Sequence, residues 1–207
     1  MARACCDDWA AVFPERTAII DLAEDGARSV WTFGALKDAS DRLAAAMRNA
    51  GVKKGDRVAI LLSQCPEVMV AHFAAMKLGA VVLPLFTLFG EDALSYRLMD
   101  SGAVLAVTDS THLDKLVSAA AGTALHTIVT KGRTSAAGAP RIVAWDDALR
   151  GAASGFCAEV VGAEDPAVLI YTSGTTGAPK GALHAHRFLR GHLPSVEMVL
   201  ERPRPGD

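Results

Sequence analysis

Short runs of almost uninterrupted apolar residues alternate along this chain with longer segments in which apolar residues recur every three or four positions. Strands buried on both faces of a sheet read as continuous apolar runs, because helices cover both faces. The runs are RVAILLS (57–63), AVVLPL (80–85), AVLAVTD (103–109), ALHTIVT (124–130) and AVLIY (167–171). The alternation predicts an α/β fold, with a layered, largely parallel sheet and flanking helices.

The segments between the runs carry helix signals. Residues 33–50 place Leu36, Leu43 and Met47 at helical spacing, and Thr32 is in position to cap this helix. Further helices are predicted at 66–79, 91–102 and 110–122, a short strand at 17–21, and loops at 131–140 and 150–165.

One apolar stretch, Val68–Phe89, is long enough to cross a bilayer, which takes about 20 residues. His72, Lys77 and Pro84 interrupt it, and Gly79 divides it into a helix-like half and a strand-like half. The stretch is therefore predicted to be a buried helix followed by a buried strand, and not a membrane span.

Composition favours small-molecule partners. The 207 residues include 23 acidic and 21 basic side chains, for a formal net charge of −2, so no strong field attracts nucleic acid or an anionic membrane. The four cysteines lack the spacing of a zinc site, and no metal site is predicted from them. The N-terminus carries acids where a signal peptide needs an apolar core, which predicts a cytoplasmic location.

The stretch YTSGTTGAPKG, residues 171–181, has the composition of a phosphate-binding loop. Its glycines let the backbone turn tightly and bring N–H groups close to a ligand, its hydroxyls donate hydrogen bonds, and its lysine neutralises phosphate oxygens. The residues predicted to bind the nucleotide are Thr172, Ser173, Gly174, Thr175, Thr176, Gly177, Ala178, Pro179 and Lys180. Lys180 is also the predicted catalytic residue.

This loop differs from the phosphate loop of P-loop phosphotransferases. That motif needs Gly-Lys-Ser/Thr opening a helix, whereas here Pro179 precedes Lys180 and Gly181 follows it. The next segment, GALHAH (181–186), looks like a strand, with a helix beginning near Arg187. A loop that joins two strands disfavours a generic P-loop enzyme.

Taken with its neighbours, YTSGTTGAPKGALHAHR (171–187) closely resembles the signature of the adenylate-forming enzymes, the AMP-binding synthetases and ligases that include the acyl-CoA synthetases. The resemblance extends upstream through WTFGALKDASDRLAAAMRNAGVKKGDRVAILLSQCPE and AAMKLGAVVLPLFTLFGEDALSYRLMDSGA. The segment PLFTLFGEDALSYRL (84–98) looks most like the acetyl and medium-chain branch.

The resemblance implies an activity and its substrates. Enzymes of this family join a carboxylic acid to ATP, which gives an acyl-adenylate and pyrophosphate, and then transfer the acyl group to the thiol of coenzyme A. Carried over to this sequence, Thr172 to Lys180 would hold the β- and γ-phosphates while Mg²⁺ shares their charge. Preorganised donors and cations of this kind stabilise the charge that develops on a leaving group.

The resemblance also implies that the chain is truncated. Residues 1–207 correspond to the N-terminal part of the AMP-binding (adenylation) domain, with later catalytic segments and the C-terminal domain absent. Such a cut is expected to leave strand edges unpaired and apolar faces uncovered, which predicts poor solubility of the chain. This expectation rests on the apolar strands Val58–Leu62 and Ala80–Leu85. Three interpretations stay open: a working acyl-adenylating ligase, a non-catalytic nucleotide-binding module, and an inactive gene fragment.

The remaining histidines and Ser173 carry weaker signals. His184 and His186 are two apart and would share one face of a strand, but a pair without a third ligand is a weak metal signal. His72 lies in an apolar helix and is expected to be a hydrogen-bonded core residue. Ser173 lacks the Gly-x-Ser-x-Gly turn of a nucleophile, so phosphate binding is the favoured role.

Overall fold

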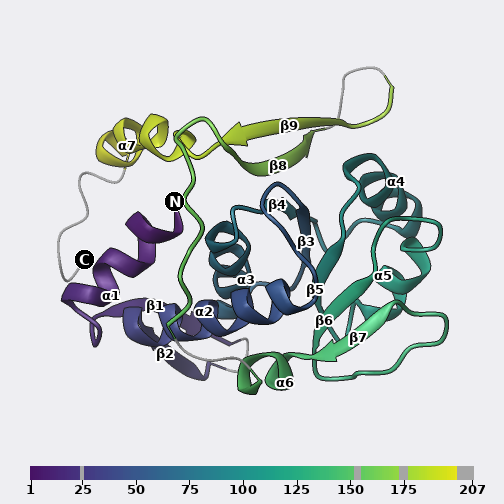
Figure 1. The fold of residues 1–207 in the computed structure, drawn as a ribbon, viewed down its shortest axis with the longest axis horizontal. Coiled ribbons are helices and arrows are strands. Elements are labelled where there is room, and N and C mark those ends of the chain that lie inside the picture. Colours follow the sequence, from purple (N-terminus) through teal and green to yellow (C-terminus); the bar gives the residue numbers. More distant parts are fainter. Residues whose placement is uncertain (24–25, 152–154, 173–176, 200–207) are drawn as a thin grey trace.

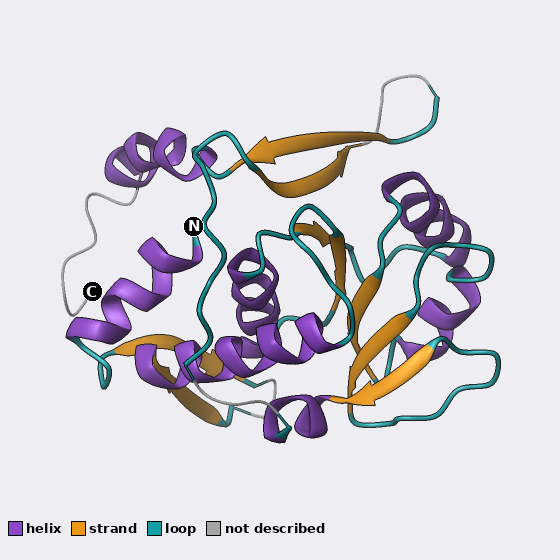
Figure 2. Ribbon diagram, in the orientation of Figure 1, coloured by secondary structure: helices purple, strands orange, loops and turns teal. Residues whose placement is uncertain are grey.

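In the residues that the computed structural model describes (1–23, 26–151, 155–172 and 177–199), a seven-stranded sheet runs through the middle of the molecule (Figures 1 and 2). Its strands are β3 (Arg57–Leu61), β4 (Val81–Pro84), β5 (Leu105–Asp109), β6 (Thr127–Lys131), β7 (Arg141–Ala144), β8 (Pro166–Thr172) and β9 (Lys180–Ala185). A separate antiparallel hairpin consists of β1 (Thr17–Leu22) and β2 (Arg28–Thr32).

Helices cover both faces of the sheet (Figure 1). They are α1 (Asp8–Val12), α2 (Phe33–Asn49), α3 (Pro66–Lys77), α4 (Glu91–Ser101), α5 (Leu113–Ala119), α6 (Trp145–Arg150) and α7 (Phe188–Val199), with a π-helical segment η1 (Arg3–Asp7) before α1. The predicted starts of α2 and α3 are confirmed, whereas the helix predicted at 110–122 begins at Leu113 and ends at Ala119. The Thr32 hydroxyl accepts a hydrogen bond from the Ala35 N–H at 3.2 Å, and Pro66 occupies the first position of α3.

Side chains that alternate along β3 enter two different cores. Val58 and Ile60 pack into the cluster formed with α2 and α3, whereas Ala59 and Leu61 pack into the cluster formed with α4 and α5. Successive strand residues point to opposite faces, so a strand buried on both sides must be apolar at every position. This explains why the central strands read as continuous apolar runs.

The strand order is β7-β6-β5-β3-β4-β8-β9. The chain passes from β3 to β4 on one side and then returns past β3 to β5 on the other, so the connections diverge between β3 and β5. In open α/β sheets ligands bind outside the carboxyl ends of the strands at such a switch point. The first six strands in this order, β7 through β8, each pair with their neighbours in parallel. The last strand, β9, pairs with β8 in the antiparallel direction.

The two apolar strands on which the predicted poor solubility rests are covered in the sheet. β3 and β4 lie between paired neighbours, and the apolar side chains of Val58–Leu62 and Ala80–Leu85 are buried except for Pro84, which is half-buried. The edge strands of the sheet are β7 and β9. Poor solubility itself stays a prediction.

Two parts of the fold were not predicted. One is the N-terminal helical segment formed by η1 and α1, and the other is β7 followed directly by α6. β7 has four residues and α6 has six, so neither is long enough to display a periodic pattern. In the part of the chain that the structure describes, no helix combines the length and apolar character needed to cross a membrane.

Candidate functional site

The predicted phosphate loop connects the two strands of the β8–β9 hairpin. Thr172 is the last residue of β8 and Lys180 the first of β9, and the two are paired in the antiparallel register. Both are exposed. Because β8 runs parallel to β4, this end of the hairpin lies at the carboxyl edge of the sheet, where ligands of α/β folds bind.

Two glycines show why this segment tolerates few side chains. Gly177 has a φ of +105°, in the region that favours glycine. At Gly181, an added Cβ would lie 2.9 Å from Leu169 Cδ1 and 3.4 Å from the Tyr171 ring, both on the facing strand β8. Close contact between the two strands therefore fixes where β9 begins and where Lys180 is presented.

Helix α4 holds the hairpin through two tyrosines. The Tyr96 hydroxyl donates a hydrogen bond to the Pro179 carbonyl at 3.1 Å, and the Tyr171 hydroxyl donates one to the Asp100 carboxylate. The two rings contact edge to face, with centroids 6.3 Å apart. Burial raises the pKa of Tyr171, and the hydrogen bond to Asp100 raises it further, so the phenol stays protonated and donates.

The structure describes five of the nine predicted nucleotide-binding residues. Thr172, Gly177, Ala178, Pro179 and Lys180 all lie at the described end of the hairpin. The others, at 173–176 (Ser173, Gly174, Thr175 and Thr176), lie outside the described residues. Within the described part of the chain, Lys180 has no carboxylate partner, so its ammonium group is available to an anionic ligand.

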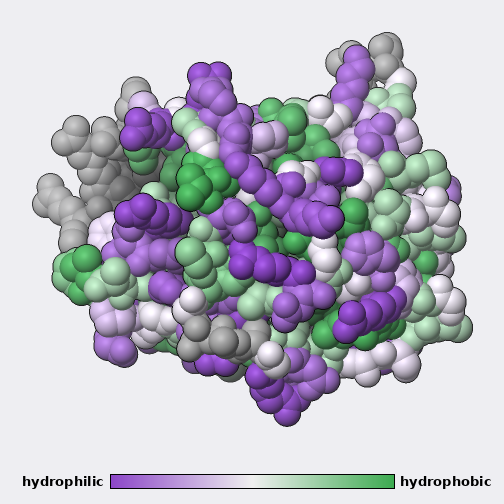
Figure 3. Space-filling view, viewed as in Figure 1, coloured by the Kyte–Doolittle hydropathy of each residue, from purple (hydrophilic) through white to green (hydrophobic). Residues whose placement is uncertain are grey.

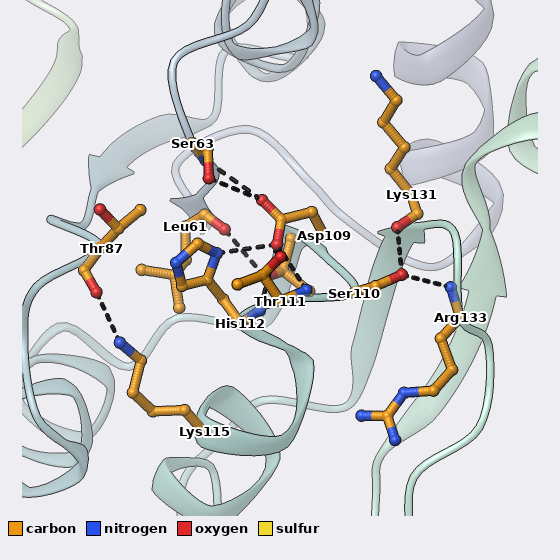
Figure 4. Close-up of polar contacts among 11 residues, drawn as sticks. Leu61, Ser63, Thr87, Asp109, Ser110, Thr111, His112, Lys115, Lys131 and Arg133 are labelled. Atoms are coloured by element: carbon orange, nitrogen blue, oxygen red, sulfur yellow. Dashed lines mark hydrogen bonds and ion pairs between the residues drawn. The ribbon is translucent and has the colours of Figure 1, made fainter. Parts of the chain in front are cut away.

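A polar network that sequence reasoning missed lies at the switch point between β3 and β5 (Figure 4). Asp109, at the end of β5, accepts hydrogen bonds from the Ser63 N–H and hydroxyl, both at 3.3 Å, through Oδ2. Its Oδ1 accepts from the Thr111 N–H at 2.9 Å and from His112 Nδ1 at 2.8 Å. Burial opposes ionisation of Asp109, but the Ser63 N–H and the His112 ring outweigh it, so the pKa of Asp109 is lowered.

The printed contacts of this network join loops at the ends of the strands. The Ser63 hydroxyl donates to Asp109, and among the described residues it makes no hydrogen bond to His112. Lys115 donates to the Thr87 carbonyl at 2.6 Å, and the side chain of Lys131 pairs with Glu67, so each of these ammonium groups already has an acceptor. The sequence feature that could have identified Asp109 is its position as the last residue of a buried strand.

A cavity of about 320 Å³ opens beside the network, at the carboxyl ends of β3, β4 and β8. Its walls are mostly apolar, and its polar members are Gln64, His72, Arg97 and Tyr171. The last of these directly precedes the phosphate loop.

His72 is only partly as predicted. It lies in α3 among apolar neighbours, but it lines the cavity, and no hydrogen bond to it occurs among the described residues, so the predicted hydrogen-bonded state is wrong. Burial lowers the pKa of His72 to about 4, so the ring is neutral at pH 7. Helix periodicity marked His72 as inward-facing but gave no sign of the cavity.

The pair His184 and His186 does not form a shared face of β9, because the strand ends at Ala185. The His184 ring contacts Phe188, with centroids 5.0 Å apart, while His186 Nδ1 lies 3.2 Å from the amino group of Met1. Among the described residues no group of three or more His, Cys, Asp or Glu side chains is placed to hold a metal ion.

Comparison with known proteins gives a consistent result. A family model described as AMP-binding enzyme matches residues 6–201. The chain is 35% identical over 196 residues to acetyl-coenzyme A synthetase 2 of Eremothecium gossypii, covering 87% of this chain and 28% of that protein. It is 33% identical over 200 residues to acetyl-coenzyme A synthetase of Sodalis glossinidius, covering 89% of this chain and 31% of the relative.

Solved structures show the same likeness in three dimensions. An acyl-CoA synthetase of Brucella canis superposes with a TM-score of 0.83 at 29% identity, covering 95% of this chain and 35% of that one. The anthranilate CoA ligase AuaEII, solved in complex with anthranoyl-AMP, superposes with a TM-score of 0.77 at 27% identity, covering 93% of this chain and 37% of that one. The chain thus spans about a third of the length of these proteins.

Proposed function

This chain belongs to the family of AMP-binding enzymes, and on that premise we propose that residues 1–207 are the N-terminal part of the adenylation domain of an acyl-CoA synthetase. The reaction would join a carboxylic acid to ATP, release pyrophosphate and pass the acyl group from the acyl-adenylate to coenzyme A. The cytoplasmic location inferred from the N-terminus stays a prediction.

In this proposal the described end of the β8–β9 hairpin binds the β- and γ-phosphates of ATP. The observation that carries it is the pairing of Thr172 with Lys180 across the mouth of the loop. This pairing puts a hydroxyl next to an ammonium group that has no carboxylate partner among the described residues, at the carboxyl ends of the strands, where ligands of α/β sheets bind. Lys180 would neutralise charge on the pyrophosphate as it leaves, and Thr172 would donate a hydrogen bond to it.

Mg²⁺ is part of the proposed reaction as the partner of the nucleotide phosphates. The described residues hold no acidic cluster for a divalent cation, and the hydroxyl and ammonium donors of the loop suit phosphate oxygens better than a metal. The metal would share the phosphate charge with Lys180 when ATP is bound. This chain's own contribution would be to orient the phosphates and to present Lys180 through the hairpin held by α4.

The first experiment is equilibrium binding of MgATP to the purified chain and to Lys180→Ala. We expect the variant to bind roughly tenfold to a hundredfold more weakly, because a charge-assisted contact to phosphate is lost. Lys53→Ala is the matched control, since Lys53 is also an exposed lysine but precedes β3, at the opposite edge of the sheet. Equal affinity of Lys180→Ala and the unchanged chain would contradict the proposed loop.

The second experiment separates the three interpretations of the chain. Acid-dependent exchange of labelled pyrophosphate into ATP by the chain alone identifies a working ligase. MgATP binding without exchange for any carboxylic acid identifies a nucleotide-binding module. Neither binding nor exchange, followed by exchange when a second polypeptide supplying the rest of the relatives' length is added, identifies a fragment of a ligase.

A further inference from the structure

The segment that leads into β8 contains neither a helix nor a strand. We call residues 155–165 the acidic strap; they cross the molecule as a green segment that reaches the start of β8 (Figure 1). The strap contains three acidic side chains, Glu159, Glu164 and Asp165, and no lysine or arginine. None of its residues is buried, and only Phe156 among them packs against the core cluster of α2 and α3.

Charged contacts hold the acidic strap on the N-terminal half of the chain. Arg48 Nη2, at the end of α2, lies 2.8 Å from Glu159 Oε1. Lys54 Nζ, in the turn before β3, lies 2.7 Å from Asp165 Oδ2. The Glu159 N–H also donates a hydrogen bond to the Lys77 carbonyl at 2.7 Å. The strap is thus fixed near its middle and at its end.

The side chain of Lys54 reaches the strap through a gap that a glycine leaves. Its ammonium group also donates to the Val160 carbonyl at 3.1 Å. Gly79 has a φ of +64°, and an added Cβ there would lie 2.9 Å from Lys54 Cγ and 3.1 Å from Val161 Cγ1. The absence of a side chain at Gly79 therefore leaves room for both Lys54 and the strap.

The last residues of the acidic strap are bonded to the segment between β9 and α7. The Ala163 carbonyl accepts from the Arg187 N–H at 2.8 Å, and the Asp165 carbonyl accepts from the His186 N–H at 3.0 Å. Glu164 Oε2 lies 3.2 Å from Arg187 Nε. The end of the strap, the β8–β9 hairpin and the start of α7 therefore form one connected unit.

This unit has little other attachment at the end where β8 begins. β8 pairs with β4 only at Val168 and Val82, whereas β3 pairs with β4 along its first four residues. Tyr96 and Tyr171 join the hairpin to α4, but Tyr96 does so at the loop end. The position of the first residues of β8 is therefore left largely to the strap.

The ion pairs of the strap are of a kind that salt weakens. The side chains of Arg48, Glu159, Lys54 and Asp165 are 35% to 49% exposed. The hydrogen bond from Lys54 lowers the pKa of Asp165, so this carboxylate is ionised at pH 7. Exposed ion pairs contribute little stability each and are screened by dissolved ions.

We propose that the acidic strap is a salt-sensitive tether: its ion pairs with Arg48 and Lys54 fix the place where β8 begins, and their screening lets this end of the β8–β9 hairpin separate from β4. The inference goes beyond the proposed ATP binding and does not depend on it. It concerns the end of the hairpin opposite to residues 172–180, and its test needs no nucleotide.

The test is amide hydrogen exchange of the complete 207-residue chain, followed by NMR. The Glu159 N–H reports on the strap, and the amides of residues 167–169 report on β8 where it pairs with β4. We expect both to exchange faster as sodium chloride rises from about 20 mM to about 500 mM, since salt screens exposed charges. The amide of Val107, in the central strand β5, is the internal reference and should keep its rate.

Two lysine variants separate the ion pair from a general effect of charge. Lys54→Gln should speed exchange at Glu159 and at residues 167–169 roughly twofold to fivefold at low salt, and it should reduce the dependence on salt, because an exposed ion pair is lost. Lys53→Gln is the matched control. It alters the neighbouring exposed lysine, which has no ion pair among the described residues, and should leave exchange unchanged.

A double-mutant cycle tests the other ion pair. Arg48→Gln and Glu159→Gln should each speed exchange at residues 167–169, and the double variant should exchange no faster than either single variant, because both changes remove the same contact. If a variant fails to fold by circular dichroism, the salt dependence of the unchanged chain decides the matter.

Several results would overturn the proposal. They are salt-independent exchange in the unchanged chain, equal behaviour of Lys54→Gln and Lys53→Gln, and additive effects in the double-mutant cycle. Faster exchange at Glu159 without any change at residues 167–169 would also overturn it, since the strap would then open without moving β8.

Discussion

Among single residues, Lys77 shows most clearly how a buried charge can organise the chain. It is 1% exposed, yet its ammonium group lies 2.6 Å from Asp41 Oδ1, 2.8 Å from Asp7 Oδ1 and 2.9 Å from the Ser40 hydroxyl. These partners belong to η1 and α2, while Lys77 ends α3. One side chain thus joins three helical segments, η1, α2 and α3.

We predict that Lys77→Met lowers the free energy of unfolding by about 3–5 kcal/mol, because it removes the cation that pairs with Asp7 and leaves Asp41 with Lys37 alone. Urea unfolding followed by circular dichroism measures the change. The control Lys53→Met alters an exposed lysine and should stay within about 0.5 kcal/mol of the parent protein.

The double variant Lys77→Met with Asp7→Asn should recover part of the loss, since it removes the carboxylate whose ion pair is broken, whereas Asp41 keeps its ion pair with Lys37. A loss below about 1 kcal/mol for Lys77→Met would mean that the carboxylates find other partners or water, and the predicted role of Lys77 would be wrong.

Among the secondary-structure elements, the β8–β9 hairpin depends most on a neighbour. β9 pairs only with β8, so within the described chain its position is set by that strand and by contacts with α4. Tyr96 contributes the hydrogen bond to the Pro179 carbonyl just before Lys180. The helix therefore acts as a support for the loop that we propose to bind ATP.

Tyr96→Phe is predicted to loosen this end of the hairpin. Loss of one hydrogen bond, worth about 0.5–1.5 kcal/mol, should speed amide hydrogen exchange at Gly181 and Ala182 roughly twofold to tenfold, as measured by NMR. Thr123→Val is the matched control, because it also removes a hydroxyl bond to a carbonyl, here Ala120 at the end of α5. Exchange that changes equally in both variants would refute a specific supporting role for Tyr96.

For the whole molecule, the feature with the clearest consequence is the outer edge of β9, which pairs with no strand in the described part of the chain. On the face drawn in Figure 3 hydrophobic side chains form separate patches among hydrophilic ones. Leu183, on β9, is 58% exposed, and Leu193 on α7 is exposed as well. An edge strand with exposed apolar side chains invites pairing with another chain.

We therefore predict that the isolated chain associates through β9, with a larger mass at higher concentration in light scattering coupled to gel filtration. Leu183→Glu should restore the monomer, because a charge on an edge strand opposes pairing. Leu22→Glu, at an exposed leucine of the separate β1–β2 hairpin, should leave association unchanged. A monomer at every concentration would contradict the prediction.

The family resemblance and the helix–strand alternation were read correctly from the sequence, whereas the cavity was not. Arg97 belongs to no recognisable sequence motif. Its guanidinium group is buried against the rings of Phe89 and Tyr171, which are far apart in the chain. Likewise Asp109 meets Ser63 only because β3 and β5 are neighbours in the sheet. The spacing of residues along the chain does not predict such tertiary contacts.

By itself, the sequence determined the central elements, and it predicts a phosphate-binding chemistry for the loop. Runs such as 57–63 favour buried strands, because a strand covered on both faces must be apolar at successive positions. Tertiary structure alone decided the strand order, the short elements β7 and α6, and the burial of Lys77 and Arg97. The physical reason is that local patterns fix which face of an element is buried, whereas its partners are chosen by packing among segments distant in the chain.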